Sequence, residues 1–193
     1  MKPFKMFWGS SYDRGLEYLL EIWEEVLKQI PVAELHICYG WDLFDKAHGG
    51  NIEMMKWKDK MVKLMSQKQI VHHGRLSKEK VDELTASCDV WAYFCNFSET
   101  NCITAINCQK LGVVPITMKR AGLIDTVYSG ITIETDDEIT PQVKQDYIKA
   151  LVYAHENPEW LKEQSEIGKN GVSRFYWENI ASNWAKHFED EQH

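Results

Sequence analysis

The stretch NFSETNCITAINCQKLGVVP, residues 96–115, combines a polar cluster, a helix-like run and a strand-like ending. Glu99 lies in a cluster of Asn, Ser and Thr ahead of an apolar run, and Gly112 ends that run before Val-Val-Pro-Ile. The residues just before the stretch, DVWAYF at 89–94, have the composition of a buried strand. The stretch therefore predicts a strand-loop-helix-strand unit with polar groups where the helix begins.

The same alternation of strands and helices runs along the chain. Strands are predicted at 4–8, 34–39, 70–74, 89–94, 113–117 and 130–134. Helices are predicted at 16–30 (with Asp13 as N-cap), 52–66, 77–87, 100–111, 123–128, 141–156, 158–170 and 176–190, and residues 42–51 resemble a loop. This order predicts an α/β fold with a doubly wound parallel sheet, Rossmann-like, in which ligands bind outside the carboxyl ends of the strands.

Length and composition predict a single domain over residues 1–193, ending in helices at about 141–190. The composition, 44% hydrophobic and 26% charged, is that of a globular protein with a real core. No apolar run approaches a membrane span, and the N-terminus does not resemble a signal peptide. The net charge of −7 disfavours nucleic-acid binding. Five cysteines without a C-x-x-C pair predict reduced thiols in the cytoplasm and argue against a zinc site.

Polar side chains follow several of the predicted strands. Because the carboxyl ends of parallel strands meet at one edge, these loops are expected to converge in space. The residues concerned are Ser10, Ser11, Asp13, Arg14, His73, Arg75, Asn96, Ser98, Glu99 and Thr100.

The loop at 96–104 is the sharpest candidate for anion binding. If the helix starts near Thr100, the backbone N–H groups of Asn101, Cys102 and Ile103 have no helical partner and form a cradle for a phosphate. The helix dipole favours such an anion by about 0.3–1 kcal/mol at exposed sites. The alternative is purely structural: Ser98 or Thr100 caps the helix while Glu99 favours its positive end.

Arg14 and Gly15 open the first predicted helix. A guanidinium there can reach a phosphate from the opposite side, and glycine allows close backbone approach. The alternative is a surface arginine, which is slightly unfavourable at a helix N-terminus. Neighbouring His72 and His73 suggest a metal, but adjacent strand residues point to opposite faces, so no metal site is predicted.

Several stretches in order resemble the donor-binding, C-terminal domain of retaining GT-B glycosyltransferases, the large group 1, family 4-like class that includes sucrose synthases. The similarity spans nearly the whole chain. The stretches are SSYDRGLEYLLEIW, AELHICYGW, IVHHGRLSKEKVDEL, DVWAYFCNFSETNCITAINCQKLGVVPIT and AGLIDTV.

This resemblance implies that the substrate is a nucleoside-diphosphate sugar and that neither a metal nor another cofactor is required. Arg14 would bind the diphosphate and Glu99 the sugar hydroxyls, which makes them the expected catalytic residues. The region from His73 to Leu76 would line the nucleobase pocket, and the amides from Asn101 to Thr104 would bind phosphate oxygens. The expected donor-binding residues are Ser10, Ser11, Gly15, His73, Gly74, Arg75, Asn101, Cys102, Ile103, Thr104 and Asn107.

Three departures from the family pattern stand out. Asn107 replaces a second glutamate that would hold the ribose hydroxyls, a loss of about 1–2 kcal/mol, or roughly 5- to 30-fold in donor affinity. Phe94 stands where proline is common. The stretch Gly9-Ser10-Ser11 lacks the usual basic residue, so phosphate neutralisation would depend mainly on Arg14.

The resemblance covers only one of the two domains of such enzymes, and the N-terminal, acceptor-binding domain has no counterpart in this sequence. Domain closure completes such sites, so this chain is expected to need an N-terminal domain or a partner chain for transfer. The alternative is a catalytically degenerate module that binds a nucleotide or a protein. A third, less favoured alternative is an unrelated phosphate-binding protein with a doubly wound sheet. The sequence does not identify the base, the sugar or the acceptor.

Overall fold

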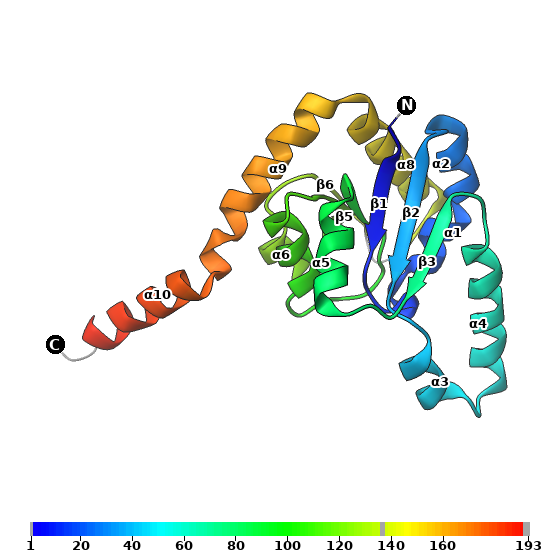
Figure 1. Cartoon of the computed structure of the whole chain (residues 1–193), viewed down its shortest axis with the longest axis horizontal. Helices are drawn as coiled ribbons and strands as arrows, with labels where there is room; N and C mark the ends of the chain where they lie inside the picture. Colours follow the sequence, from blue (N-terminus) through cyan, green and yellow to red (C-terminus); the bar gives the residue numbers. More distant parts are fainter. Residues whose placement is uncertain (1, 136–137, 191–193) are drawn as a thin grey trace.

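The computed structural model contains one six-stranded sheet in which all strands are parallel (Figure 1). It describes residues 2–135 and 138–190, so the outermost parts of the expected domain, Met1 and residues 191–193, lie outside the described residues, as do residues 136–137. The strands are β1 (Phe4–Trp8), β2 (Ala33–Cys38), β3 (Ile70–Gly74), β4 (Val90–Tyr93), β5 (Val114–Met118) and β6 (Ile131–Ile133).

The strand order is β3-β2-β1-β4-β5-β6. The chain winds outward from β1 to β3 and then returns to the other side of β1 with β4. This confirms the expected α/β, doubly wound sheet. The order reverses between β1 and β4, and such a switch point is where open parallel sheets bind ligands.

Helices cover both faces of the sheet (Figure 1). Helices α5 and α6 lie on one face, and α1, α2 and α8 lie on the other. The helices are α1 (Leu16–Glu21), α2 (Trp23–Gln29), α3 (Asp42–His48), α4 (Ile52–Met65), α5 (Lys78–Ala86), α6 (Ile103–Lys110), α7 (Leu123–Thr126), α8 (Pro141–Glu156), α9 (Pro158–Val172) and α10 (Trp177–Asp190), with 3₁₀ turns η1 (Tyr12–Arg14) and η2 (Ser173–Phe175).

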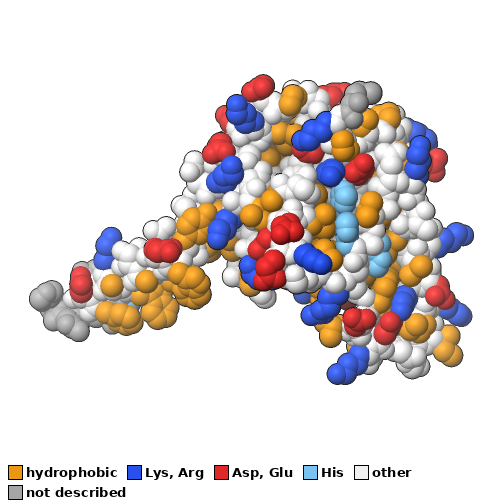
Figure 2. Space-filling model, in the orientation of Figure 1, with side chains coloured by type: hydrophobic (Ala, Val, Ile, Leu, Met, Phe, Trp, Pro, Cys, Tyr) orange, Lys and Arg blue, Asp and Glu red, His pale blue; other side chains and the backbone are white. Residues whose placement is uncertain are grey.

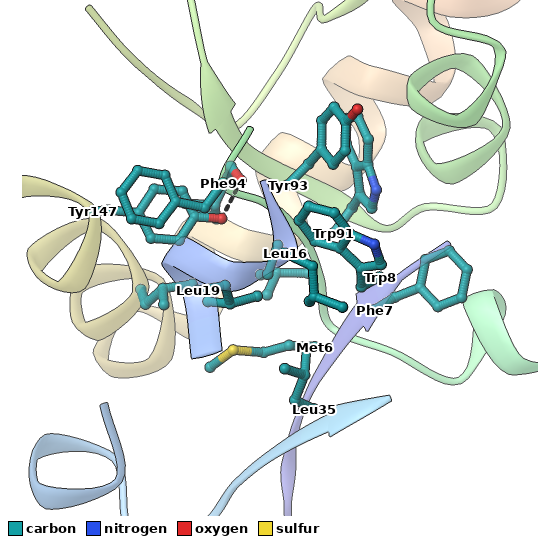
Figure 3. Packing of buried hydrophobic residues seen from close by; sticks show 14 of the residues in the cluster. Met6, Phe7, Trp8, Leu16, Leu19, Leu35, Trp91, Tyr93, Phe94 and Tyr147 are labelled. Carbon is teal, nitrogen blue, oxygen red and sulfur yellow. Dashed lines mark hydrogen bonds between the residues drawn. The ribbon is translucent and has the colours of Figure 1, made fainter. Parts of the chain in front are cut away.

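The central strands are buried on both faces, as expected for a parallel sheet with helices on each side. In β4 every residue is buried, and the ring of Tyr93 stacks on Trp91 with centroids 4.7 Å apart (Figure 3). Phe94, just after β4, stacks on Tyr147 of α8 at 4.1 Å. These contacts fix the end of β4, where the polar loop begins.

The prediction of a loop at 42–51 is wrong for its first part, because residues 42–48 form α3. Its aromatic side chain Phe44 packs between Trp41 and Trp57, with centroids 5.3 and 5.4 Å away. Trp57 belongs to α4, so a contact across the helix pair stabilises a helix that the local sequence does not indicate.

The predicted helix at 16–30 is two helices, α1 and α2, divided at Ile22. The backbone of Ile22 (φ −96°, ψ −2°) departs from helical geometry, and its N–H bonds to the carbonyl of Leu20. Asp13 is not an N-cap but part of η1, and Gly15 precedes α1 in the left-handed conformation. The other predicted helices lie within a few residues of their expected bounds.

Helix α10 extends away from the body of the molecule (Figure 1). Its apolar side chains Trp177, Trp184 and Phe188 are 81, 64 and 54% exposed and form an apolar strip (Figure 2). Residues 176–190 were predicted to form a helix, which is confirmed, and its apolar strip is largely uncovered in the described part of the chain. Across the described part of the chain, no helix has the length and apolar character needed to cross a membrane.

Candidate functional site

Arg14 and Glu99 meet at the switch point of the sheet. Arg14 ends η1, which follows β1, and Glu99 lies in the loop that follows β4. The Nη1 of Arg14 donates to both carboxylate oxygens of Glu99, at 2.9 and 3.2 Å. The Glu99 side chain is 9% exposed and that of Arg14 is 36% exposed. The two expected catalytic residues therefore form one half-buried ion pair at the carboxyl edge.

Gly15 makes this approach possible. Its φ of +114° is in the left-handed region, and a Cβ there would lie 2.7 Å from the carbonyl oxygen of Phe94 and 2.9 Å from Cα of Cys95. Any side chain would thus collide with the backbone after β4. The loops after β1 and β4 are thus in close contact at Gly15, and its expected approach to a phosphate stays a prediction.

Two aromatic residues complete the surroundings of the ion pair. The Tyr93 hydroxyl donates to Oε1 of Glu99 at 2.6 Å, and the guanidinium of Arg14 lies 4.4 Å from the ring centre of Phe97. Burial of Arg14 lowers its pKa, but Glu99 and Tyr93 raise it, and the net change of the pKa is upward. Sequence analysis missed Tyr93 and Phe97. The one available signal was a polar hydroxyl in an otherwise apolar central strand, directly before the polar loop.

Helix α6 begins at Ile103 rather than near Thr100. The Glu99 carbonyl accepts from the N–H of Gly122 at 2.7 Å, which ties the loop to the segment after β5, and Cys102 becomes the residue that precedes the helix. The first-turn amides are therefore those of Ile103 and the two residues after it, and the expected cradle at 101–103 is shifted along the chain.

The sulfur of Cys102 is part of this helix start. Burial raises the pKa of its thiol to about 11, while the nearby backbone N–H groups of Ala105 and Thr104 lower it. The residue directly before α6 is Cys102, whose side chain forms no capping hydrogen bond, so neither Ser98 nor Thr100 caps this helix.

The two histidines of β3 point to opposite faces of the sheet, as predicted. The ring of His72 bonds to the Tyr12 hydroxyl at 2.7 Å, and that hydroxyl accepts from the N–H of Gly40 at 2.8 Å. His73 bonds instead to Nδ1 of His36, at 3.0 Å. His73 therefore lies against β2. In residues 2–135 and 138–190, no three His, Cys, Asp or Glu side chains are grouped to hold a metal ion.

Gly74, Arg75 and Leu76 lead from β3 to the carboxyl edge. Gly74 has a φ of +65°, and Arg75 and Leu76 line a cavity of about 210 Å³ together with Gly9, Cys38, Tyr39, Leu43 and Val81. The segment from His73 to Leu76 was expected to line the nucleobase pocket. Two of its residues, Arg75 and Leu76, border this cavity, which lies beside the switch point.

Ser10 and Ser11 lie in the loop after β1. Ser10 is buried, and its carbonyl accepts from Nε1 of Trp8 at 2.8 Å. Ser11 precedes η1 and borders a cavity of about 160 Å³ lined also by Tyr39 and Trp41.

Several expected donor-binding residues of α6 and of the loop before it line a different groove. Asn101, Ile103 and Asn107 line a groove of about 740 Å³ between α6 and the η2–α10 segment, together with Ile106, Lys110, Phe175, Tyr176, Trp177, Glu178 and Ile180. Thr104 is half-buried in the first turn of the same helix. The structure therefore brings Arg14, Gly15 and Glu99 together and places Asn107 on a separate groove.

The basic pair after β5 is engaged with acidic and polar partners. Lys119 pairs with Glu134 at 2.6 Å, and Nη2 of Arg120 donates to the Ser98 hydroxyl at 3.3 Å. The bond from Arg120 links the loops after β4 and β5, so this side chain also borders the site.

No protein-family model matches the sequence, and no curated protein sequence matches it. Solved structures do match. The pneumococcal O-GlcNAc transferase GtfA, solved with UDP and GlcNAc, aligns with all of this chain at a TM-score of 0.72 and 16% identity, over 36% of its own length. HepE of Anabaena, solved with UDP and glucose, aligns with 98% of the chain at a TM-score of 0.72 and 16% identity, over 49% of its length.

Sucrose-phosphate synthase of Thermosynechococcus elongatus aligns with 98% of the chain at a TM-score of 0.71 and 18% identity, over 45% of its length. These neighbours are GT-B glycosyltransferases, and this chain spans about one third to one half of their length. The chain therefore has the fold of a domain-sized part of GT-B glycosyltransferases, as the sequence resemblance implied.

Proposed function

We propose that this chain binds a nucleoside-diphosphate sugar and forms the donor-binding part of a glycosyltransferase that acts with retention of configuration. The observation that carries the proposal is the meeting of Arg14 and Glu99, at 2.9 Å, beside the switch point and ahead of α6. A cation, a hydrogen-bonding carboxylate and a helix N-terminus at one edge are what a diphosphate joined to a sugar requires. Bound UDP in the similar GtfA and HepE structures supports the same ligand class.

In this proposal the diphosphate lies between Arg14 and the first turn of α6. When the bond from the sugar C1 to the diphosphate oxygen breaks, negative charge grows on the leaving group. The guanidinium and the first-turn amides are already oriented, so they stabilise that charge without reorganising at the moment of reaction. Glu99 accepts hydrogen bonds from sugar hydroxyls and so fixes the orientation of C1.

The remaining parts of the donor are assigned to neighbouring loops. The base is placed in the cavity beside Arg75 and Leu76, and the ribose is placed toward Asn107 on α6. Charge neutralisation by Arg14 and α6 is proposed to suffice without a metal ion or another cofactor.

The acceptor is proposed to bind to an N-terminal domain or a partner chain. The observation that supports this is length, because the chain spans less than half of GtfA, HepE and sucrose-phosphate synthase. Five buried cysteines, all unpaired, favour a reducing compartment, and the cytoplasm is the proposed location.

Titration calorimetry tests the proposal. The chain is titrated with UDP, GDP and ADP and then with the corresponding glucose and mannose derivatives. Saturable binding of one nucleotide family is the expected result. Absence of heat with every one of them, for protein that shows a cooperative thermal transition, would overturn the proposal.

A second candidate is a degenerate transferase domain that binds a nucleotide without transfer. Asn107 favours it, because asparagine keeps one acceptor for the ribose but lacks the charge of a carboxylate. An assay of sugar release from the bound nucleotide sugar, with an N-terminal domain or partner chain supplied, separates the two candidates. Release favours the transferase, and binding without release favours the degenerate domain.

A further inference from the structure

Glu99 has two partners that differ in how firmly they are held. One is Arg14, whose side chain is 36% exposed and lies against Phe97, itself 42% exposed. The other is Tyr93, which is fully buried and donates its hydroxyl to Oε1 of Glu99 at 2.6 Å. Arg14 can therefore leave the carboxylate more readily than Tyr93 can.

The surroundings of Tyr93 fix the direction of its hydroxyl. Its ring stacks on Trp91 with an interplanar angle of 13° and contacts Trp8 with centroids 5.0 Å apart (Figure 3). Its carbonyl accepts from the hydroxyl of Thr117 on the neighbouring strand at 2.8 Å. The side chain thus belongs to the packed centre of the sheet and reaches the polar loop only through its oxygen.

The proton on this oxygen is retained. Burial raises the pKa of Tyr93 well above its usual value, and Glu99 beside it raises it further. A carboxylate only accepts hydrogen bonds, so the hydroxyl donates to Glu99. Ser10, from the loop after β1, acts in the opposite direction and lowers the pKa of Tyr93.

Binding of a diphosphate creates a conflict for the ion pair. The guanidinium that neutralises Glu99 is the same group that the proposed function assigns to the phosphates. If Arg14 turned to the phosphates and Glu99 had no other donor, a buried carboxylate would lose its partner, which is strongly unfavourable. The Tyr93 hydroxyl is a donor that remains in place through that exchange.

We propose that Tyr93 is a positioning residue that holds Glu99 toward the donor sugar when Arg14 moves to the diphosphate. The inference rests on the proposed function, because it concerns the same site. Tyr93 does not touch the substrate in this account and acts through Glu99. Its removal should therefore affect recognition of the sugar more than recognition of the nucleoside diphosphate.

The test compares Tyr93→Phe with the wild-type chain in calorimetric titrations with UDP and with UDP-glucose. The variant removes one oxygen and keeps the ring stack on Trp91. We expect the Kd for UDP to stay within twofold and the ratio of the Kd for UDP-glucose to that for UDP to rise at least fivefold. An unchanged ratio, or equal weakening of both ligands, would overturn the inference.

Tyr147→Phe is the matched control. The Tyr147 hydroxyl is also buried and donates to a backbone carbonyl, that of Ile116, at 2.7 Å, without contact to the ion pair. This variant should lower the melting temperature as Tyr93→Phe does and leave the ratio of the two Kd values unchanged. A similar rise of the Kd ratio in Tyr147→Phe would mean that the ratio reports the lower stability of the variant protein and not the positioning of Glu99.

A double-mutant cycle with Glu99→Gln shows whether Tyr93 acts through Glu99. Glu99→Gln should raise the same ratio, and adding Tyr93→Phe to it should change the ratio by less than twofold. Independent, multiplicative effects would contradict the inference. Failure of the wild-type chain to bind any nucleotide would instead overturn the proposed function itself.

Discussion

The guanidinium of Arg14 lies 2.9 Å from the carboxylate of Glu99, although 85 residues separate them in the chain. The strand order explains the contact, because β1 and β4 are neighbours and both chain segments leave the sheet at its carboxyl edge. The pair keeps the cation and the carboxylate close together before any ligand arrives. Under the proposed function, a diphosphate competes with Glu99 for the guanidinium, so that function links ligand binding to rearrangement of the pair.

Arg14→Ala should weaken the binding of UDP at least tenfold. The variant removes a guanidinium that can form two charge-assisted bonds to phosphate oxygens, and hydrogen bonds to charged groups contribute about 1.5–3 kcal/mol each. The measurement is the Kd from titration calorimetry. Lys28→Ala serves as control, because Lys28 lies near the end of α2, which leads into the amino end of β2. Equal affinity of Arg14→Ala and the wild-type chain would contradict the assignment of this residue.

Three glycine-to-alanine variants should separate backbone strain from steric collision. Gly50→Ala should be close to neutral, because nothing lies within 4 Å of a Cβ there. Gly74→Ala meets no atoms but has a φ of +65°, which costs a non-glycine residue about 1–2 kcal/mol. Gly15→Ala combines a φ of +114° with contacts of 2.7 Å to backbone and should be the most destabilising.

The free energy of unfolding in urea checks this order. Gly15→Ala should also weaken UDP binding in whatever fraction remains folded, because the loops after β1 and β4 must move apart. The same stability for Gly15→Ala and Gly74→Ala would show that the loops separate at little cost, contrary to the contact in the structure.

Much of the fold could be predicted from the sequence, since strands such as FKMFW and VVPIT are short apolar runs followed by turn or polar residues. Their alternation with helices leaves few arrangements for a parallel sheet. Helix α3 could not be predicted in this way, because it depends on packing of Phe44 against Trp57 of another helix. The start of α6 was missed because the carbonyl of Glu99 bonds to Gly122, a partner that is distant in sequence.

The candidate site was predictable only in part. Arg14 and Glu99 were found because the loops after parallel strands converge at one sheet edge and because the resemblance assigned them roles. Their direct contact was not predicted, since it depends on side-chain geometry. Tyr93 was hidden by its position in an apolar strand, where a tyrosine is ordinary. His73 was expected beside the base, but its bond to His36 follows from the register of β2 and β3.

The free energy of unfolding should fall as the pH is lowered below about 6.5. Burial lowers the pKa of His36, His72 and His73 from the ordinary value of 6.5, with smaller effects from neighbouring charges. The unfolded chain therefore binds protons at a higher pH than the folded chain does. The stability from the neutral rings is present above pH 6.5 and is lost as the pH falls through the lower folded-state pKa values.

Urea unfolding at pH 7.5, 6.5 and 5.5 measures this dependence. His36→Asn should flatten it, because His36 bonds to His73 and lies beside Glu34. Glu21, whose pKa is lowered by Lys144 and Lys60 against the effect of burial, loses its contribution only below pH 4.5 and stays outside this window. Stability that is constant or rises toward pH 5.5 would contradict the prediction.

Asn107→Glu should strengthen UDP binding roughly 5- to 30-fold, which corresponds to about 1–2 kcal/mol. A carboxylate at this position on α6 can accept from both ribose hydroxyls, whereas the amide offers one acceptor oxygen. Lys110, one helical turn further and on the same groove, can partly neutralise the new charge. The gain should vanish for the 2′,3′-dideoxy nucleotide, which lacks both hydroxyls. A gain that persists with the dideoxy nucleotide would show that the effect does not come from the ribose, and no gain at all would place the ribose away from α6.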